Sequence, residues 1–308
     1  MKLKLFFVSL IFFIFAASSS FGILFDPTGS GGENQKYLID FHALQWSSSA
    51  SLLKDIDPTQ SGDKFTVYSH ATLTTFKNSQ DKDVSEISTM LGYDIEITYV
   101  MGFGEYISGS YPGGTFDTFA FDPTNPTNFF QIYLDTTPDA DPLEGTGFND
   151  GTLIAWGNVV SSNGFFTMTD SQSQNLDQYG DDDWNGQQSV AGGGYSDVTT
   201  VSGPLHFNTD YFINLPPTYS LIFSETSYAH LPFDGANPSR SFWDGSGYIT
   251  PDLGTINGLP QSTGGTDILI QIGGTSSIKV VPEPATMLLF GTSLLGLVGI
   301  GRRKLRHS

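Results

Sequence analysis

Short runs rich in aromatic and β-branched residues recur through the middle of the chain, and Gly, Pro, Asn and Asp separate them. The clearest are 65–76 (FTVYSHATLTTF) and 94–101 (DIEITYVM). The same pattern recurs at 115–121, 129–134, 152–160, 164–169, 218–224 and 268–272. Runs of this length between turn residues are typical of strands. We therefore predict an all-β, antiparallel body, built as a β-sandwich or a jelly roll.

Four local features refine this expectation. Residues 49–55 suggest a short helix, and Ser162-Asn163-Gly164 predicts a hairpin turn between two strands. Two long polar segments, 170–196 and 231–264, read as loops. Loops of that length are uncommon unless they are functional or mobile.

The N-terminus, residues 1–22, has the parts of a secretory signal peptide. Lys2 and Lys4 precede an apolar core at 5–17, and small residues follow it. Ser20 and Gly22 suit the −3 and −1 positions of a signal peptidase site, and cleavage near Ala17 or Ser18 is the alternative. The apolar core, which we expect to be helical, is short for a transmembrane helix. We therefore predict export through the general secretory route.

The C-terminus, residues 281–308, has three parts in a fixed order. The triplet Pro282, Glu283, Pro284 leads into 16 uncharged residues at 285–300, and a basic cluster closes the chain: Arg302, Arg303, Lys304 and Arg306. As a helix the apolar run spans about 24 Å, short for a hydrocarbon core about 30 Å thick, and snorkelling cations make up part of the difference. Prolines favour extended geometry, so the triplet would be an accessible peptide at the membrane face.

This tail resembles the PEP-CTERM sorting signal, which has the same triplet, helix and basic end. The resemblance implies that the C-terminal helix inserts transiently in the inner membrane, where an integral-membrane exosortase recognises and removes the tail. It also implies a final location on the outer surface of a Gram-negative bacterium that makes exopolysaccharide. A plain C-terminal membrane anchor is the alternative interpretation.

The body between these ends, residues 23–280, is strongly acidic. The chain has 13 basic and 32 acidic residues; the signal takes Lys2 and Lys4, and the tail takes four cations and Glu283. That leaves 7 basic and 31 acidic residues, a net charge of −24. Such a field repels nucleic acid and anionic membranes and attracts divalent cations. The chain has no cysteine, which excludes thiol nucleophiles and Cys-zinc sites.

Part of the middle is similar to the flocculation-associated PEP-CTERM proteins. The similarity lies in 129–159 (FFQIYLDTTPDADPLEGTGFNDGTLIAWGNV) and in 211–223 (YFINLPPTYSLIF). It implies an adhesive or floc-forming role at the cell surface and brings no catalytic residues with it.

One acidic segment has the spacing of a calcium loop. Asp181, Asp183 and Asn185, followed by a glycine, match the first half of the EF-hand pattern. Position twelve, where an EF-hand has a bidentate Glu, is Gly192. The segment is therefore not an EF-hand, and it is either a calcium loop of a β protein or a solvated acidic turn.

Other candidate residues are weaker. Asp94 and Glu96 share one face of a strand about 6.6 Å apart, within the range of an inverting glycosidase pair, but any half-exposed strand shows this pattern. His42, His70, His206 and His230 are scattered without metal-binding spacing. Trp46, Trp156, Trp184 and Trp243 could stack on sugars. Trp156 lies in a strand-like run, where we expect it to be buried, and Trp184 and Trp243 lie in polar loops and are the better candidates.

The sequence as a whole predicts an exported, non-enzymatic protein of the cell surface or extracellular matrix, adhesive or biofilm-associated. One alternative is a carbohydrate-binding module for exopolysaccharide. Another is a secreted glycoside hydrolase or lyase. Exposed tryptophans along a groove would favour binding, and two carboxylates converging in a groove would favour an enzyme.

Overall fold

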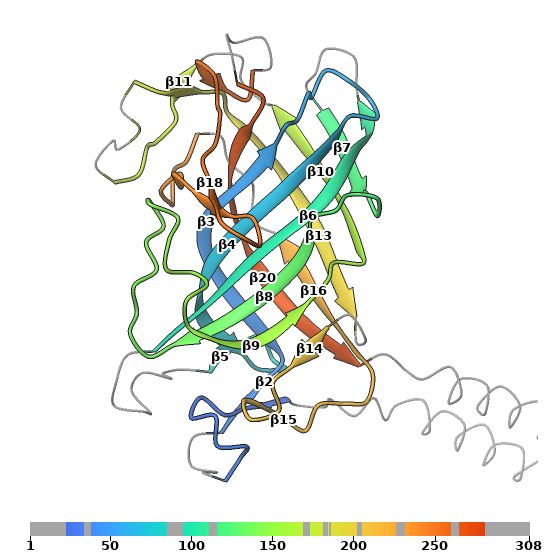
Figure 1. The fold of residues 1–308 in the computed structure, drawn as a ribbon, viewed down its shortest axis with the longest axis vertical. Coiled ribbons are helices and arrows are strands. Elements are labelled where there is room, and N and C mark those ends of the chain that lie inside the picture. The colour runs from blue at the N-terminus through green and yellow to red at the C-terminus, as the bar shows by residue number, and fades with distance from the viewer. Residues whose placement is uncertain are drawn as a thin grey trace, which may run out of the picture.

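One antiparallel sheet of twelve strands forms the body of the protein in the computed structural model (Figure 1). The structure describes residues 23–33, 38–84, 95–110, 116–168, 173–180, 184, 186–201, 205–225, 232–259 and 265–280. The strands of this sheet are β3 (Ala43–Lys54), β4 (Lys64–Lys77), β5 (Asp83–Val84), β6 (Glu96–Ser110), β7 (Phe116–Phe121), β8 (Asn128–Asp135), β9 (Thr152–Gly157), β10 (Ser161–Met168), β13 (Gly192–Val201), β14 (His206–Phe207), β16 (Tyr219–Glu225) and β20 (Ile268–Val280).

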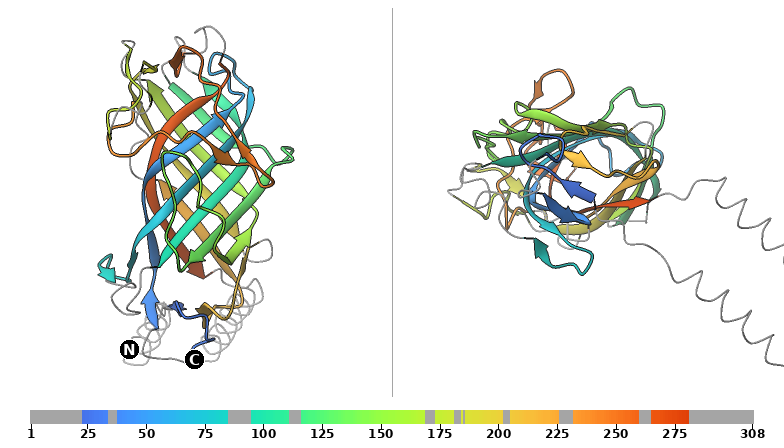
Figure 2. Two further views of the ribbon diagram at one scale, coloured as in Figure 1. Left: turned by 60° about the vertical axis from the view of Figure 1, so that its left-hand side comes forward. Right: turned by 90° about the horizontal axis from the view of Figure 1, so that it is seen from below.

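The sheet closes on itself because β4 pairs along both edges. One edge of β4 bonds β3 and the other bonds β6, from Lys64↔Tyr106 to Thr72↔Thr98. The pairing therefore runs through β6, β7, β10, β13, β16, β20, β3 and β4 and back to β6. Seen from below in Figure 2, the strands ring a central axis. The first half of β6 also pairs with β8, which carries β9 and β14 beside it.

The predicted all-β class and antiparallel pairing are confirmed, but the two packed sheets of a sandwich or jelly roll are replaced by one closed sheet. Alternating apolar residues reveal that a strand exists, but they do not reveal which strand pairs with its far edge. The expected strands correspond to β4, β6, β7, β8, β9, β10, β16 and β20.

Three local expectations are wrong. Residues 49–54 lie in β3, and 49–53 pair with β20, because Ala50 and Leu52 pack beneath outer loops while Ser51 and Leu53 face inward. The turn predicted at 162–164 lies inside β10, which pairs with β7 and β13, and the true connection is 158–160. The loop predicted at 170–196 already contains the start of β13.

The main core fills the interior of the closed sheet and is rich in aromatic residues. Trp46 meets Tyr99 edge-on with ring centroids 4.8 Å apart, and Phe223 meets Phe130 at 5.0 Å. The Trp46 indole N–H donates to the Ser276 hydroxyl at 2.9 Å. Burial of large side chains at roughly 25 cal/mol per Å² is the main stabilising contribution here.

A small three-stranded sheet covers the lower end of the interior. Its strands are β1 (Ile23–Phe25), β2 (Ile39–Phe41) and β15 (Phe212–Ile213). The ring of Phe25 lies 5.2 Å from Phe76 and 5.3 Å from Phe212. The blue N-terminal segment crosses this end in Figure 2.

Both ends of the described chain lie at this lower end. Ile23 pairs with Phe41, and the next residue, His42, accepts a hydrogen bond from Ile278 N at 3.4 Å. Residue 280 ends β20 in the same region, opposite Tyr219.

Long connections form an outer layer over β3, β4 and β20. They contain β11 (Gln174–Asn175), β12 (Gln188–Ser189) and β19 (Ile256–Asn257), and a hairpin of β17 (Phe242–Trp243) and β18 (Tyr248–Ile249). This layer lies beside β3 and β4 in Figure 1. Leu176, Phe233 and Phe242 bury their side chains in a second cluster with Leu52 and Leu269. The two predicted loops thus contribute a second core.

The terminal segments 1–22 and 281–308, both expected to contain helices, lie outside the described residues. In the described part of the chain, no helix combines the length and the apolarity needed to cross a membrane.

His70 joins the outer layer to the closed sheet. Its side chain is 1% exposed and lies between the rings of Phe148 and Phe242, with centroids 4.1 and 4.9 Å away and nearly parallel planes. Nε2 lies 2.8 Å from the Ser239 hydroxyl, which itself donates to Pro142 O at 2.6 Å. Since that hydroxyl proton is already engaged, Nε2–H is the donor. Burial lowers the pKa of His70 to about 3, so the imidazole is neutral in the folded protein.

We expect His70→Phe to relieve part of the loss of stability in acid. An unfolded histidine takes up a proton below a pKa of about 6.5. The folded His70 resists protonation down to about pH 3. Stability is therefore lost as pH falls between these values. At pH 4.5 this lowers the free energy of unfolding of the wild type by about 2 to 3 kcal/mol, a loss that His70→Phe does not suffer.

Urea unfolding of both proteins at pH 7.5 and 4.5 measures this difference, with exposed His42→Asn as the matched control. A difference between His70→Phe and wild type that does not change with pH would contradict the assignment.

Candidate functional site

The predicted sorting residues follow the last strand of the closed sheet. Pro282, Glu283 and Pro284 lie outside the described residues, as does the basic cluster Arg302, Arg303, Lys304 and Arg306. β20 ends at Val280, which pairs with Tyr219. The triplet therefore begins two residues after a strand that bonds neighbours on both edges.

The predicted calcium residues Asp181, Asp183 and Asn185 also lie outside the described residues, so calcium binding there remains a prediction. A different acidic group converges in the described part. Asp135 ends β8, and Asp139 and Asp150 lie in the connection to β9; their carboxylate oxygens are all within 4.8 Å of one another. These three residues are of the type that can hold a divalent cation. The signal for them was the acidic stretch of 129–159.

Like charge dominates this cluster. The nearby carboxylate of Asp150 raises the pKa of Asp139, with smaller effects of desolvation and of Asp135. Burial raises the pKa of the neighbouring Glu96, although its Oε1 accepts hydrogen bonds from the backbone N–H groups of Asp139 and Ala140 at 3.1 Å each. Glu96 thus holds the connection in place. Its expected partner Asp94 lies outside the described residues.

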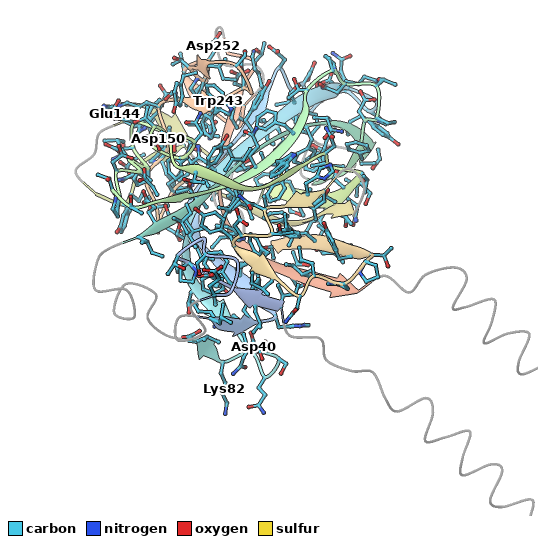
Figure 3. The ribbon with its side chains drawn as sticks, turned by 60° about the horizontal axis from the view of Figure 1, so that its bottom comes forward. Asp40, Lys82, Glu144, Asp150, Trp243 and Asp252 are labelled. Carbon is cyan, nitrogen blue, oxygen red and sulfur yellow. The ribbon has the colours of Figure 1, made fainter. Side chains whose placement is uncertain are left out.

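The two tryptophans predicted to bind sugar are both half-buried. The Trp184 indole N–H donates to Pro238 O at 2.6 Å, and its ring packs on the second core cluster. Trp243 meets Tyr248 at an interplanar angle of 66° with centroids 5.6 Å apart. Figure 3 shows Trp243 on the same side as Glu144 and Asp150, away from Asp40 and Lys82. Sugar binding at Trp184 and Trp243 remains a prediction.

The expectation that Trp156 is buried is wrong, since its side chain is 39% exposed. Gln131, Trp156 and His206 lie opposite one another on β8, β9 and β14. The Trp156 and His206 rings stack with centroids 5.5 Å apart and planes 23° apart. A shallow depression of about 290 Å³ opens over them, with Phe129 and Asn158 at its sides.

A β-bulge explains why Trp156 faces outward. Ile132 pairs with Ala155 but Tyr133 pairs with Leu153, so Ile154 is an extra residue in β9. Ile154 and Ala155 are both buried, and the alternation resumes one residue late. Bulges commonly redirect side chains in this way. Strict alternation from buried Ile154 would have placed Trp156 in the core.

The interior of the closed sheet contains a second candidate site, a small cavity beside a buried carboxyl group. A cavity of about 40 Å³, room for roughly two or three water molecules, is lined by apolar side chains including Met101, Phe103 and Ile270. Glu105 also lines it and is 4% exposed, and Oε1 accepts no hydrogen bond from any described residue. Burial raises the pKa of Glu105 to about 7, although the nearby Ser162 hydroxyl opposes this rise.

We expect Glu105→Gln to stabilise the protein above neutral pH. The folded carboxyl group keeps its proton up to about pH 7, whereas an unfolded glutamate loses it near pH 4.5. Wild-type stability therefore falls as pH rises through this interval, by about 3 kcal/mol, and the neutral amide avoids the loss. Urea unfolding at pH 5 and pH 8 compares the two proteins, and exposed Glu33→Gln is the control. Equal pH profiles for Glu105→Gln and wild type would show that the buried carboxyl group is not responsible.

Comparison with known proteins identifies the tail alone. Residues 280–304 match the family described as the PEP-CTERM protein-sorting motif. Neither the curated proteins nor the solved structures contain a significant match to the chain. The motif implies an exported protein that is sorted to the cell surface and processed by an exosortase. The chain therefore carries a PEP-CTERM protein-sorting motif at its C-terminus.

Proposed function

We propose that residues 23–280 form an adhesive, non-enzymatic component of the extracellular matrix of a Gram-negative bacterium, delivered by the sorting motif. The main support is the position of the sorting motif, which follows the last strand of the closed sheet directly. The first and last described residues also lie at the same end of the sheet. A protein delivered in this way has its sides and its far end free for contacts away from the membrane.

Charge sets the conditions for adhesion. Among the described cations, Lys54, Lys64, Lys77 and Arg240 each pair with a carboxylate. Acidic residues far outnumber basic ones in the chain, so the cations can neutralise only a minority of the carboxylates. Exposed charges are screened beyond roughly 8–10 Å at physiological ionic strength, and divalent cations can bridge carboxylates at shorter range. Adhesion of this protein should therefore strengthen with calcium.

The hydrolase or lyase alternative would need carboxylates placed about a bound sugar. Among the described residues, the carboxylates of Asp135, Asp139 and Asp150 converge beside Glu96, and the backbone N–H groups of residues 139 and 140 already bind the Glu96 carboxylate. We therefore favour adhesion and keep turnover as a measured outcome of the test below.

Processing should remove the tail near residues 282–284. We expect the surface form to lack residues beyond about 285, because the sorting motif places the recognised triplet there. Intact-mass measurement and C-terminal peptide mapping check this, and Glu283→Ala with Pro284→Ala should retain the tail. Recovery of surface protein that still contains Ser308 would contradict it.

Cells that lack the protein should stay dispersed while they make a normal amount of polysaccharide. Full-length chain should restore aggregation, added calcium should strengthen it, and chelator should weaken it. Sedimentation of cell suspensions and total polysaccharide measure the two effects. Normal aggregation without the protein would overturn the adhesive role. Breakdown of the polysaccharide by purified protein, lost in Glu96→Gln, would establish the enzyme instead.

A further inference from the structure

We propose that the outward row Gln131–Trp156–His206 on β8, β9 and β14 is a binding platform for a neutral hexopyranose polysaccharide. The platform rests on the proposed function, because it names the matrix component that the surface protein would contact. Neither half-buried tryptophan of the outer layer belongs to it.

The aromatic part of the platform is flat and open. Trp156 is 39% exposed, His206 is also exposed, and their rings lie within 23° of parallel. Together they extend a flat surface across two neighbouring strands. A pyranose ring presents a face of C–H groups, and an apolar, slightly positive face of this kind packs well on an aromatic ring.

The exposed position of Trp156 forgoes the free energy that burial of its ring would contribute. A large aromatic side chain gains from burial, and the strand carries it in a run that would otherwise point it inward. The extra residue Ile154 turns it out instead, over a depression of about 290 Å³. Sites with a concave shape, an aromatic floor and a few polar groups are typical of small-ligand recognition.

Polar groups suited to sugar hydroxyls flank the rings. The Tyr133 hydroxyl donates to Gln131 Oε1 at 3.0 Å, which orients the amide and leaves its N–H₂ without a hydrogen bond to any described residue. The His206 ring nitrogens likewise make no hydrogen bond within the described part of the chain, where the ring's contact is with Trp156. An amide donor and an imidazole beside a flat ring can bind hydroxyl groups while the ring binds the sugar face.

Charge decides which polysaccharide fits. No Lys or Arg occurs between Lys82 and Arg240, an interval that contains all three strands of the platform. The residues that line the depression also include no Lys or Arg, so a carboxylated or sulfated polymer would find no fixed cation there and would meet a strongly negative protein. A protein partner is also a poor fit, since a specific interface buries about 800 Å² on each side and the exposed aromatic surface here is a single pair of rings.

Titration with polysaccharides tests the platform. The probes are hydroxyethyl cellulose and galactomannan as neutral polymers and alginate as the acidic one, measured by affinity electrophoresis and calorimetry on the processed surface protein. We expect wild type to bind a neutral probe and Trp156→Ala to bind it at least about tenfold more weakly, because the stacking surface is gone. Trp156→Tyr should be intermediate, and Gln131→Ala should weaken binding less than Trp156→Ala.

The matched control is Tyr179→Ala, which removes another exposed aromatic ring (51% exposed) from the outer layer. It should bind like wild type, and melting curves of all variants check that they fold. If Trp156→Ala does not fold, the folded Trp156→Tyr and Gln131→Ala decide. Unchanged binding in these variants, binding of alginate alone, or no binding of either neutral polymer would overturn the platform.

The two proposals fail separately. Dispersed cells after deletion of the protein, together with unchanged binding in Trp156→Ala, would leave the adhesive role intact and remove the platform. Normal aggregation after deletion, together with lost binding in Trp156→Ala, would keep the platform and remove the adhesive role.

Discussion

The pairing of β4 with β3 on one edge and β6 on the other is the constraint on which the structure depends. It converts an open antiparallel sheet into a closed one, so no long strand edge of that ring remains to pair with another chain. It also creates two distinct apolar regions. Inward side chains meet in the aromatic interior, and outward ones such as Leu52 and Leu269 need the long connections as a cover.

Each of these two regions buries one ionisable side chain in its neutral form. Glu105 faces the interior and His70 faces the outer layer, and desolvation acts on both. Desolvation favours the protonated carboxyl group but the deprotonated imidazole. The two groups therefore limit stability from opposite sides of the pH scale. Burial of Glu105 lowers the stability of the fold as pH rises, whereas burial of His70 lowers it as pH falls.

The sequence was sufficient for most of the long strands, for the all-β class and for the tail, because these depend on local periodicity or on a compact motif. Closure depends on pairing between distant residues, such as Lys64 with Tyr106, which leaves no local mark. Residues 49–54 were expected to be helical but lie in a strand, because pairing with β20 and β4 on both edges overrides the local preference. Trp156 was misplaced because a single bulge reverses the alternation, and the acidic group at Asp135, Asp139 and Asp150 forms only when a connection folds back on its strand.

Because β20 is the last strand in the sequence, the sheet can close only after this strand has been made. The Trp46 indole bonds Ser276 across 230 residues, so the first and last long strands are neighbours in space. Synthesis begins at the N-terminus, so β3 forms before the strand that pairs with its free edge. Until residues 268–280 arrive, β3 and β16 present unpaired edges, the kind of surface on which incomplete chains aggregate. Because the sorting motif follows β20 at once, a chain that carries the motif is also one that has everything needed to close, and truncated chains lack both.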